Sequence, residues 1–387
     1  MTPGARAQAA IGVLDSWTAG LPAEQALTNW ARGARYAGSG DRAAVRDMVY
    51  DVLRARGSCA ALGGGDTGRA LVLGLLRLQG ADPAALFSGE GHAPDPQSAA
   101  EAIAPDAVPD PATDVPAWTV PYLAERAGAD LPTLLAGFRH RAPLYLRVNR
   151  RKATRAQAID RLAAEGVTAI PDARAATAIE VTSGARRVKS SAAYAEGWVE
   201  PQDLSVQRAL AAIDWPEGRI LDFCAGGGGK ALAITDACAA QVFAHDAAPR
   251  RMADLPGRAA RAGVRITTLD PGALARAGRF DAVLCDVPCS GSGTWRRDPE
   301  AKWRLTPARL ANLLQVQAAI LAEAAPRVAA GGLLVYMTCS LFAAENEAQI
   351  DGFLDRHPGW ERVGQGVDTP LSASDGFFHA ILRAPQR

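Results

Sequence analysis

The chain has 387 residues, of which 48% are hydrophobic and 21% are charged, and its formal net charge is +1. This length suffices for two or three domains. The near-zero charge excludes a general polycation, so a nucleic acid would have to be held by a local basic patch. No apolar run reaches the roughly 20 residues that cross a bilayer, and the N-terminus lacks the pattern of a signal peptide. We therefore expect a cytoplasmic protein without a membrane partner, whose thiols stay reduced.

Residues 5 to about 80 are rich in alanine and follow a helical hydrophobic period. In the segment 41–56, DRAAVRDMVYDVLRAR, the apolar residues share one face, and Asp41 after a glycine is a plausible N-cap. Residues 91–116 are dense in proline and aspartate, which is typical of a linker or a thin loop-rich segment. We predict that residues 1–116 form a helical domain that ends in this segment.

The second predicted part, residues 117–205, is a small α+β unit with a basic edge. Its segment 139–155, RHRAPLYLRVNRRKATR, carries seven Arg or Lys residues and no acid. Arginines in such a run can bind phosphate groups, whereas the alternative is a solvated surface. We expect nucleic-acid contact, and we name Arg147, Arg150 and Arg151 as the contacting residues.

From about residue 206, short apolar strands alternate with helical stretches. The strand sequences are GRILDFCA, AQVFAHDA, VRITTLD, FDAVLCDVP and GGLLVYMTCS. Alternation at this spacing predicts βαβ units and a mostly parallel, doubly wound sheet over residues 206–387. Ligands of such sheets bind at the carboxyl ends of the strands, so we expect the functional site at that edge.

The segment 220–234, ILDFCAGGGGKALAI, reads as a strand, a four-glycine turn and the start of a helix. Glycines let the backbone approach a ligand, and the N–H groups of a helix start suit an anionic group. Asp246 ends the next strand, where a carboxylate can bind ribose hydroxyls. This combination favours a nucleoside cofactor over a merely tight turn. The fingerprint GxGxxG fits only if it ends at Ala231, so we prefer S-adenosylmethionine to NAD. Asp270, after the third strand, either faces the adenine or is a solvated loop acid.

The six cysteines form no CxxC pair, and the chain has only five histidines. We therefore expect no metal site. We interpret Cys224, Cys238 and Cys285 as small buried hydrophobes. Cys289 and Cys339 differ, because Pro-Cys-Ser-Gly and Thr-Cys-Ser each place a thiol at a turn after an apolar strand. A disulfide between these two is disfavoured by a reducing compartment.

Two thiols at a strand edge beside a methyl donor fit one chemistry in particular. Carbon 5 of cytosine is too poor a nucleophile to take a methyl group directly, but a thiolate that adds to carbon 6 turns the ring into an enamine. A base must then remove the proton from carbon 5 so that the thiol can leave, and an acid near N3 or N4 favours addition. Cys289, Cys339 and Asp286 supply such a set. Their spacing does not rank the two thiols.

Segments between residues 139 and 387 carry a resemblance to a known family. In chain order they are LRVNRRKATR, GWVEPQDLSVQ, ILDFCAGGGGK, DVPCSGSGTWRRDPEAKW, LLVYMTCSLFAAENEAQI and DGFFHAILR. They resemble the bacterial RNA cytosine-C5 methyltransferases of the RsmB/Sun type, within the NOL/NOP/Sun family. The resemblance implies a Rossmann-like class I methyltransferase domain after a small α+β domain and an N-terminal helical, NusB-like, RNA-binding domain.

The resemblance also implies roles for individual residues. Cys339 of Thr-Cys-Ser matches the family's nucleophile, and Cys289 of Pro-Cys-Ser matches the cysteine that assists breakdown of the covalent adduct. Asp286 would lie near the methyl donor and the base, Asp246 on the ribose and Asp270 near the adenine. The implied S-adenosylmethionine site comprises Cys224, Ala225, Gly226, Gly227, Gly228, Gly229, Lys230, Asp246, Asp270 and Asp286.

One departure concerns the cofactor loop, which in the family usually reads Cys-Ala-Ala-Pro-Gly-Gly-Lys. Here Gly226 and Gly227 replace Ala-Pro, and the loss of proline lowers the rigidity of the unbound loop. The segment after Cys289 adds Arg296, Arg297 and Lys302 near the site, and we interpret Trp303 as a packing anchor rather than a platform for a base.

We predict a monomeric RNA cytosine-C5 methyltransferase whose partner is small-subunit (16S) ribosomal RNA. The target base must be reachable in single-stranded or locally opened RNA. Three alternatives stay open: the same chemistry on tRNA, methylation of DNA, which would not need Cys339, and a catalytically silent RNA-binding assembly factor, which the altered glycine loop alone supports.

Overall fold

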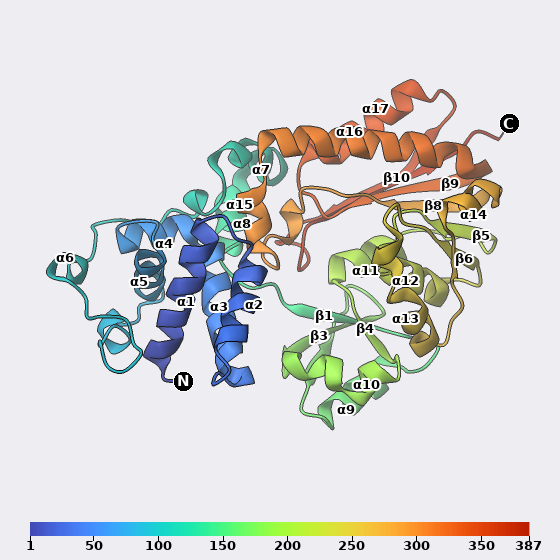
Figure 1. Ribbon diagram of the computed structural model, residues 1–387. Helices are drawn as coiled ribbons and strands as arrows, with labels where there is room; N and C mark the ends of the chain where they lie inside the picture. The colour runs from blue at the N-terminus through green and yellow to red at the C-terminus, as the bar shows by residue number, and fades with distance from the viewer. Residues whose placement is uncertain (387) are drawn as a thin grey trace. The chain divides into compact units, whose positions relative to one another are not determined.

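The computed structural model describes residues 1–386 (Figure 1). Its packing separates two compact units. Unit 1 comprises Met1–Arg141 and Trp295–Leu305, and unit 2 comprises Ala142–Thr294 and Thr306–Arg387. Residues 117–141 thus pack with the helices that precede them, and 142–205 pack with the large sheet that follows. The three-domain division at residues 116 and 205 stays a prediction. Within residues 1–386 we find no helix that is long and apolar enough to span a membrane.

Unit 1 is helical, as its hydrophobic period predicts. Its helices pack around small and branched apolar side chains, among them Leu14, Val49 and Leu71, which are fully buried. The helices are α1 (Pro3–Thr18), α2 (Ala23–Gly33), α3 (Ser39–Arg54), α4 (Arg56–Gly63), α5 (Gly68–Leu78), α6 (Ala99–Ala102), α7 (Val120–Ala127), α8 (Leu131–Gly137) and α15 (Pro299–Arg304).

The start of α3 differs from its prediction. The N-cap residue is Gly38, and Asp41 lies one turn inside, where its carboxylate accepts the N–H of Gly38 at 3.1 Å. Asp41 as N-cap is therefore wrong. A carboxylate at the third helical position can accept the free N–H of the cap residue from inside the helix. The helix therefore begins at Ser39, before the predicted position.

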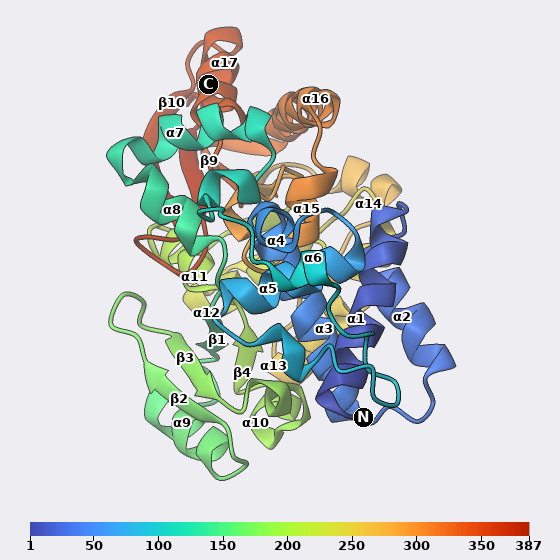
Figure 2. The ribbon, with the colours of Figure 1, turned by 90° about the vertical axis from the view of Figure 1, so that its left-hand side faces the viewer.

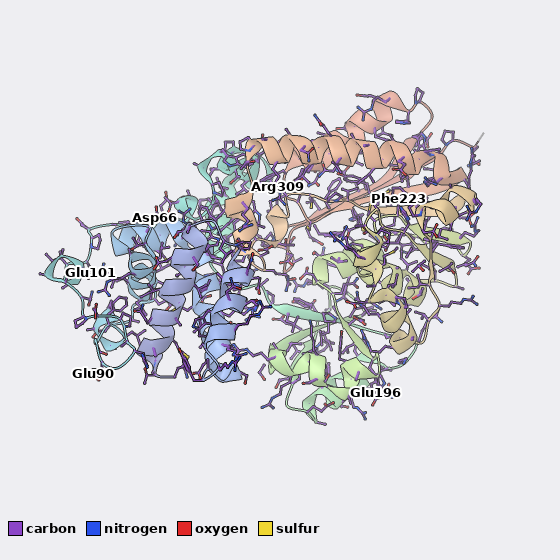
Figure 3. The ribbon with its side chains drawn as sticks, viewed as in Figure 1. Asp66, Glu90, Glu101, Glu196, Phe223 and Arg309 are labelled. Carbon is purple, nitrogen blue, oxygen red and sulfur yellow. The ribbon has the colours of Figure 1, made fainter. Side chains whose placement is uncertain are left out.

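The segment 91–116 is loop-rich, as predicted, but it is attached to unit 1. Glu101, labelled on α6 in Figure 3, forms an ion pair of 2.7 Å with Arg69. Asp114 is fully buried and accepts hydrogen bonds from Ser58 and from Arg139. These bonds fix the middle of the segment and its C-terminal end, so it is not a free linker.

The first part of unit 2 is a four-stranded antiparallel sheet with the order β2-β3-β1-β4. Figure 2 shows β2 and β3 beside α9, whose Ala158 and Leu162 pack into the core of this sheet. The predicted small α+β unit is thus present. Its elements are β1 (Leu144–Val148), α9 (Arg155–Ala163), β2 (Thr168–Pro171), β3 (Ala178–Ser183), α10 (Ala192–Ala195) and β4 (Val199–Pro201).

The rest of unit 2 is built on a seven-stranded sheet with the order β10-β11-β9-β8-β5-β6-β7. The five strands from β9 to β7 pair in parallel, and β11 and β10 pair antiparallel at one edge. This confirms the predicted Rossmann-like, doubly wound sheet. The strands are β5 (Arg219–Asp222), β6 (Gln241–Ala244), β7 (Thr267–Thr268), β8 (Phe280–Asp286), β9 (Val328–Thr338), β10 (Glu361–Asp368) and β11 (Phe377–Arg383). The helices are α11 (Leu204–Ala211), α12 (Gly229–Ala237), α13 (Leu255–Ala262), α14 (Pro271–Arg276), α16 (Pro307–Ala324) and α17 (Glu347–Arg356).

Candidate active site

Two cysteines meet where β8 and β9 end. The strands are parallel neighbours, with Asp286 opposite Met337, so the loops after them start side by side. The Sγ atoms of Cys289 and Cys339 are 3.4 Å apart, and both thiols are free and partly buried. The structure therefore brings together the two cysteines that the sequence singled out.

The hydrogen bond between the two thiols shifts their pKa values in opposite directions. Donation by the Cys289 thiol lowers the pKa of Cys339, with help from the nearby Lys230 ammonium and against the opposing effects of burial and the Asp286 carboxylate. The same bond, together with burial, raises the pKa of Cys289 well above its usual range. Since the thiolate is the nucleophilic form of cysteine, this arrangement favours Cys339 as the nucleophile.

A buried carboxylate that sequence analysis missed ties the two cysteine loops together. Glu345 is fully buried and accepts the N–H of Ser290 at 2.8 Å, the hydroxyls of Ser290 and Ser340, and the side-chain amide of Gln317 at 3.0 Å. Ser290 follows Cys289 and Ser340 follows Cys339, so one carboxylate fixes both turns. The available signal was the first acid after four apolar residues, in LFAAENEA, directly after Thr-Cys-Ser.

An ion pair lies beside the thiols. Lys230, at the start of α12, donates to Asp286 at 2.5 Å. Burial opposes the charge of Lys230, but the Asp286 carboxylate outweighs it and raises the pKa of the ammonium. Lys230 and Asp286 thus form a fixed pair of opposite charges between the glycine loop and the cysteine loops.

The glycine loop connects β5 to α12, as predicted. Gly226 and Gly228 have φ angles of +50° and +77°, in the left-handed region that side chains disfavour. A Cβ atom on Gly228 would meet the side chain of Leu255 at 2.2 Å, so a larger residue there would have to displace Leu255. The N–H of Ala225 bonds the carbonyl of His245 at 2.8 Å, and Cys224 before it is half-buried, with a pKa that burial raises.

Asp246 faces this loop from the end of β6. Its carboxylate accepts the N–H groups of Gly226 and Ala248, each at 2.9 Å, and pairs with the exposed Arg251 at 3.1 Å. Asp270, in contrast, is exposed and caps α14 by accepting the N–H of Ala273 at 2.7 Å. That placement is the one expected of a loop acid, and a role of Asp270 near an adenine stays a prediction.

Asp222, the last residue of β5, is a further buried acid that was not among the predicted site residues. Its Oδ2 accepts the N–H of Ala231 at 3.1 Å, while its Oδ1 is buried without a hydrogen-bond partner. Burial raises the pKa of Asp222 to about 7. A ligand with a hydrogen-bond donor could bond to this unpaired oxygen beside the glycine loop.

The three arginines predicted to contact RNA have different surroundings. The side chain of Arg147 is 5% exposed and pairs with Asp236 at 3.3 Å, which counts against direct RNA contact. Arg150 is 54% exposed and reaches the same aspartate at 3.7 Å. Arg151 is exposed, and its guanidinium donates a hydrogen bond to the carbonyl of Thr235.

Among the other cysteines, Cys285 is buried as predicted, and Trp303 is a packing anchor as predicted. Cys59 and Cys285 are fully buried, and Cys238 is half-buried with its thiol on the carbonyl of Ile234. Trp303 packs against the core of unit 1 and donates to the carbonyl of Leu53 at 2.8 Å. Lys302 is fully buried and donates to the carbonyl of Arg54, so it is not available as a surface cation for RNA.

Comparison with known families assigns two parts of the chain. Residues 211–385 match the family model described as 16S rRNA methyltransferase RsmB/F. Residues 115–187 match the model of the ferredoxin-like domain of RsmF/B-like methyltransferases. The first region contains all seven strands of the large sheet, and the second contains α7, α8 and three of the four strands of the small sheet.

Individual proteins give the same picture. The chain is 35% identical over 295 residues to the probable ribosomal RNA small subunit methyltransferase B of Synechocystis sp. and 34% identical over 282 residues to the ribosomal RNA small subunit methyltransferase B of Salmonella arizonae. Each alignment covers 69% of this chain and 66% of the relative, just under two thirds of its length.

Solved structures share the fold. The crystal structure of PH0851 is similar over 99% of both chains, with a TM-score of 0.77 and 23% identity. That of NSun6 from Pyrococcus horikoshii with SFG has a TM-score of 0.60 and 17% identity, and the match covers 69% of this chain and 98% of that one.

Proposed function

The chain belongs to the RsmB/F family of methyltransferases, and we propose that it transfers a methyl group from S-adenosylmethionine to carbon 5 of a cytosine in RNA. The observation that carries this proposal is the thiol pair of Cys289 and Cys339, 3.4 Å apart. One thiolate suffices to activate a pyrimidine covalently, and the second free thiol beside it is available for the release of the product.

The residues at the glycine loop fit a nucleoside with a charged amino-acid tail. Asp246 presents a carboxylate for ribose hydroxyls, at the end of the strand next to the loop. Gly226 to Lys230 offer close backbone approach, and the buried, unpartnered Oδ1 of Asp222 can accept from an ammonium group. Bound there, S-adenosylmethionine supplies an electrophilic methyl group on a sulfonium. Cys224, Ala225, Asp270 and Asp286 stay proposed members of this site.

Cys339 acts as the nucleophile. Its thiolate adds to carbon 6 of the cytosine, and the electron pair of the C5–C6 double bond becomes available at carbon 5. Carbon 5 then takes the methyl group, and the bond between that methyl group and the sulfonium sulfur breaks, which leaves a neutral thioether. Lys230 and the Cys289 thiol stabilise the thiolate before addition. We propose Asp286, the partner of Lys230, as the acid near N3 or N4 of the ring that favours addition.

Cys289 takes part in the second half of the reaction. A base such as solvent water takes the proton from carbon 5, the double bond reforms, and the sulfur of Cys339 leaves as a thiolate that can accept a hydrogen bond from the Cys289 thiol. Cys289 lies next to the departing sulfur, and we propose that it assists this elimination. Its raised pKa keeps it protonated until then.

We propose small-subunit ribosomal RNA as the substrate, because the curated relatives are named for it. The helices of residues 1–116, as an RNA-binding domain, and the segment 139–155 would bind the RNA. Methylation of tRNA is the alternative within the same chemistry. A silent assembly factor is the alternative outside it, although the intact thiol pair argues against that.

The test is transfer of a labelled methyl group to unmodified small-subunit rRNA, with tRNA in a parallel reaction, followed by identification of the methylated nucleoside. We expect 5-methylcytidine in the rRNA. Cys339→Ala should abolish transfer, whereas Cys238→Ala, outside the thiol pair, should leave it intact. Labelling of another base would refute the proposed chemistry, and no labelling with either RNA would favour the silent factor.

A further inference from the structure

The altered glycine loop has a contact that its sequence alone does not reveal. Arg258, on α13, donates through one terminal nitrogen to the carbonyl oxygen of Gly227 and through the other to Glu200 at 3.1 Å. Glu200 has a side chain only 5% exposed and also pairs with Arg261. One terminal nitrogen of the Arg258 guanidinium is therefore fixed by a buried carboxylate, while the other donates to the backbone of the glycine loop.

Position 227 and Arg258 compete for the same space. A Cβ atom on Gly227 would lie 2.9 Å from a terminal nitrogen of Arg258, closer than real Cβ contacts allow. The family pattern has proline at this position, and here it is glycine. A side chain at 227 would therefore push the terminal nitrogen of Arg258 away from its observed position, on a guanidinium that Glu200 holds from the other side.

A run of four glycines has a large conformational entropy, and ordering it for a ligand is costly. Proline would reduce that entropy from within the chain, but this loop lacks it. The hydrogen bond from the fixed guanidinium of Arg258 to the carbonyl of Gly227 restricts the same backbone through a contact with another element. Arg251, also near the loop, does not serve this purpose, since its side chain is 60% exposed and it pairs with Asp246.

We propose that Arg258 is a positioning residue for the cofactor site, which braces the glycine loop from α13 in place of the missing proline. The inference about the cofactor rests on the proposed function, but the brace itself is a property of the ligand-free chain. It makes Glu200 a second positioning residue, because Glu200 fixes the rotamer of Arg258.

The test uses four full-length variants: Arg258→Met, which keeps most of the aliphatic stem, Gly227→Ala, the double variant, and Arg265→Ala as a control that removes one exposed arginine. The first readout is amide hydrogen exchange of residues 225–231 without ligand, and the second is calorimetric affinity for S-adenosylhomocysteine. Exchange outside 225–231 and the thermal midpoint report on folding.

We expect Arg258→Met to speed exchange in the loop and to weaken binding by roughly three- to tenfold, the usual effect of one lost hydrogen bond. Gly227→Ala should do the same because it displaces Arg258. The double variant should be no worse than Arg258→Met, and the control should match the unaltered protein. Additive effects, or unchanged loop exchange in Arg258→Met, would overturn the brace. If the unaltered protein binds no S-adenosylhomocysteine, the cofactor proposal fails, whereas the exchange result still decides the role of Arg258.

Discussion

The Sγ atoms of Cys289 and Cys339 lie 3.4 Å apart, although the two residues are separated by 50 positions in the chain. The contact exists because β8 and β9 are adjacent parallel strands and because Glu345 bonds the residue that follows each cysteine. The contact lowers the pKa of Cys339 and raises the pKa of Cys289, so the two cysteines are chemically unequal before any substrate binds.

That inequality predicts the pH dependence of alkylation. Donation by Cys289 lowers the pKa of Cys339, so the Cys339 thiolate, which is the reactive form, is populated at a lower pH than in an isolated cysteine. In Cys289→Ala the donor is lost, and the pH at which iodoacetamide labels Cys339 should move upward. Mass spectrometry of the Cys339 peptide across a pH series measures this shift. A profile that does not move would mean that the thiols are not hydrogen-bonded in solution.

Loss of each cysteine should also have a different effect on turnover. Cys339→Ala should form no covalent complex with RNA, because nothing adds to carbon 6. Cys289→Ala should methylate the base and then stall, and it should accumulate a protein–RNA species that survives denaturing electrophoresis. The double variant should show no such band. Trapping that persists without Cys339 would reverse the two roles.

Glu345 should be needed to keep the cysteine loops in place. The carboxylate of Glu345 accepts hydrogen bonds from Ser290, Ser340 and Gln317. In Glu345→Gln, the NH2 group of the new amide would point at these donor groups and could not accept their hydrogen bonds. We expect the free energy of unfolding to fall by about 1–3 kcal/mol and methyl transfer to fall by tenfold or more. Glu361→Gln, on an exposed part of β10, is the matched control. Normal transfer in Glu345→Gln would show that the loops hold their positions without it.

Lys302 predicts a pH dependence of stability. Burial lowers its pKa to about 7, whereas an unfolded lysine has a pKa of about 10.4. Between these pH values the unfolded chain binds more protons than the folded one, so this residue makes stability rise with pH. Below about pH 7 its buried charge is present in full and destabilises the fold.

Urea unfolding of Lys302→Met at pH 6, 7, 8 and 9 isolates this contribution. The free energy of unfolding of the unaltered protein, minus that of the variant, should increase over this range. The exposed Lys189→Met should give a flat difference. A flat difference for Lys302→Met would mean that Lys302 keeps an ordinary pKa.

The basic segment predicts a specific salt dependence of RNA binding. Arg150 is 54% exposed, so Arg150→Ala should reduce the slope of log affinity against log salt by about one phosphate contact. Arg147→Ala should act differently, because removing one partner of a buried ion pair lowers stability on the order of 3 kcal/mol. Filter binding at several salt concentrations, with thermal unfolding of both variants, separates the two effects. Equal slopes for Arg150→Ala and the unaltered protein would make the segment a solvated surface.

The sequence by itself determined the architecture of unit 2 and the members of the thiol pair. Apolar strands that alternate with helical stretches can bury their faces only as a doubly wound sheet, and cysteines after two such strands must share its edge. The helical character of unit 1 followed from its period in the same way. These features depend on local pattern, which can be read along the chain.

Only the tertiary structure decided which charged side chains are buried and which groups they bond to. Arg147 and Arg150 belong to one basic run, yet Arg147 on β1 is buried against Asp236, whereas Arg150, after the strand, is exposed. Glu345 reaches Ser290 across 55 positions, and Arg258 reaches Gly227 across 31. Composition gives the charge of a side chain but not its partner, because the partner is set by long-range packing that no local pattern encodes.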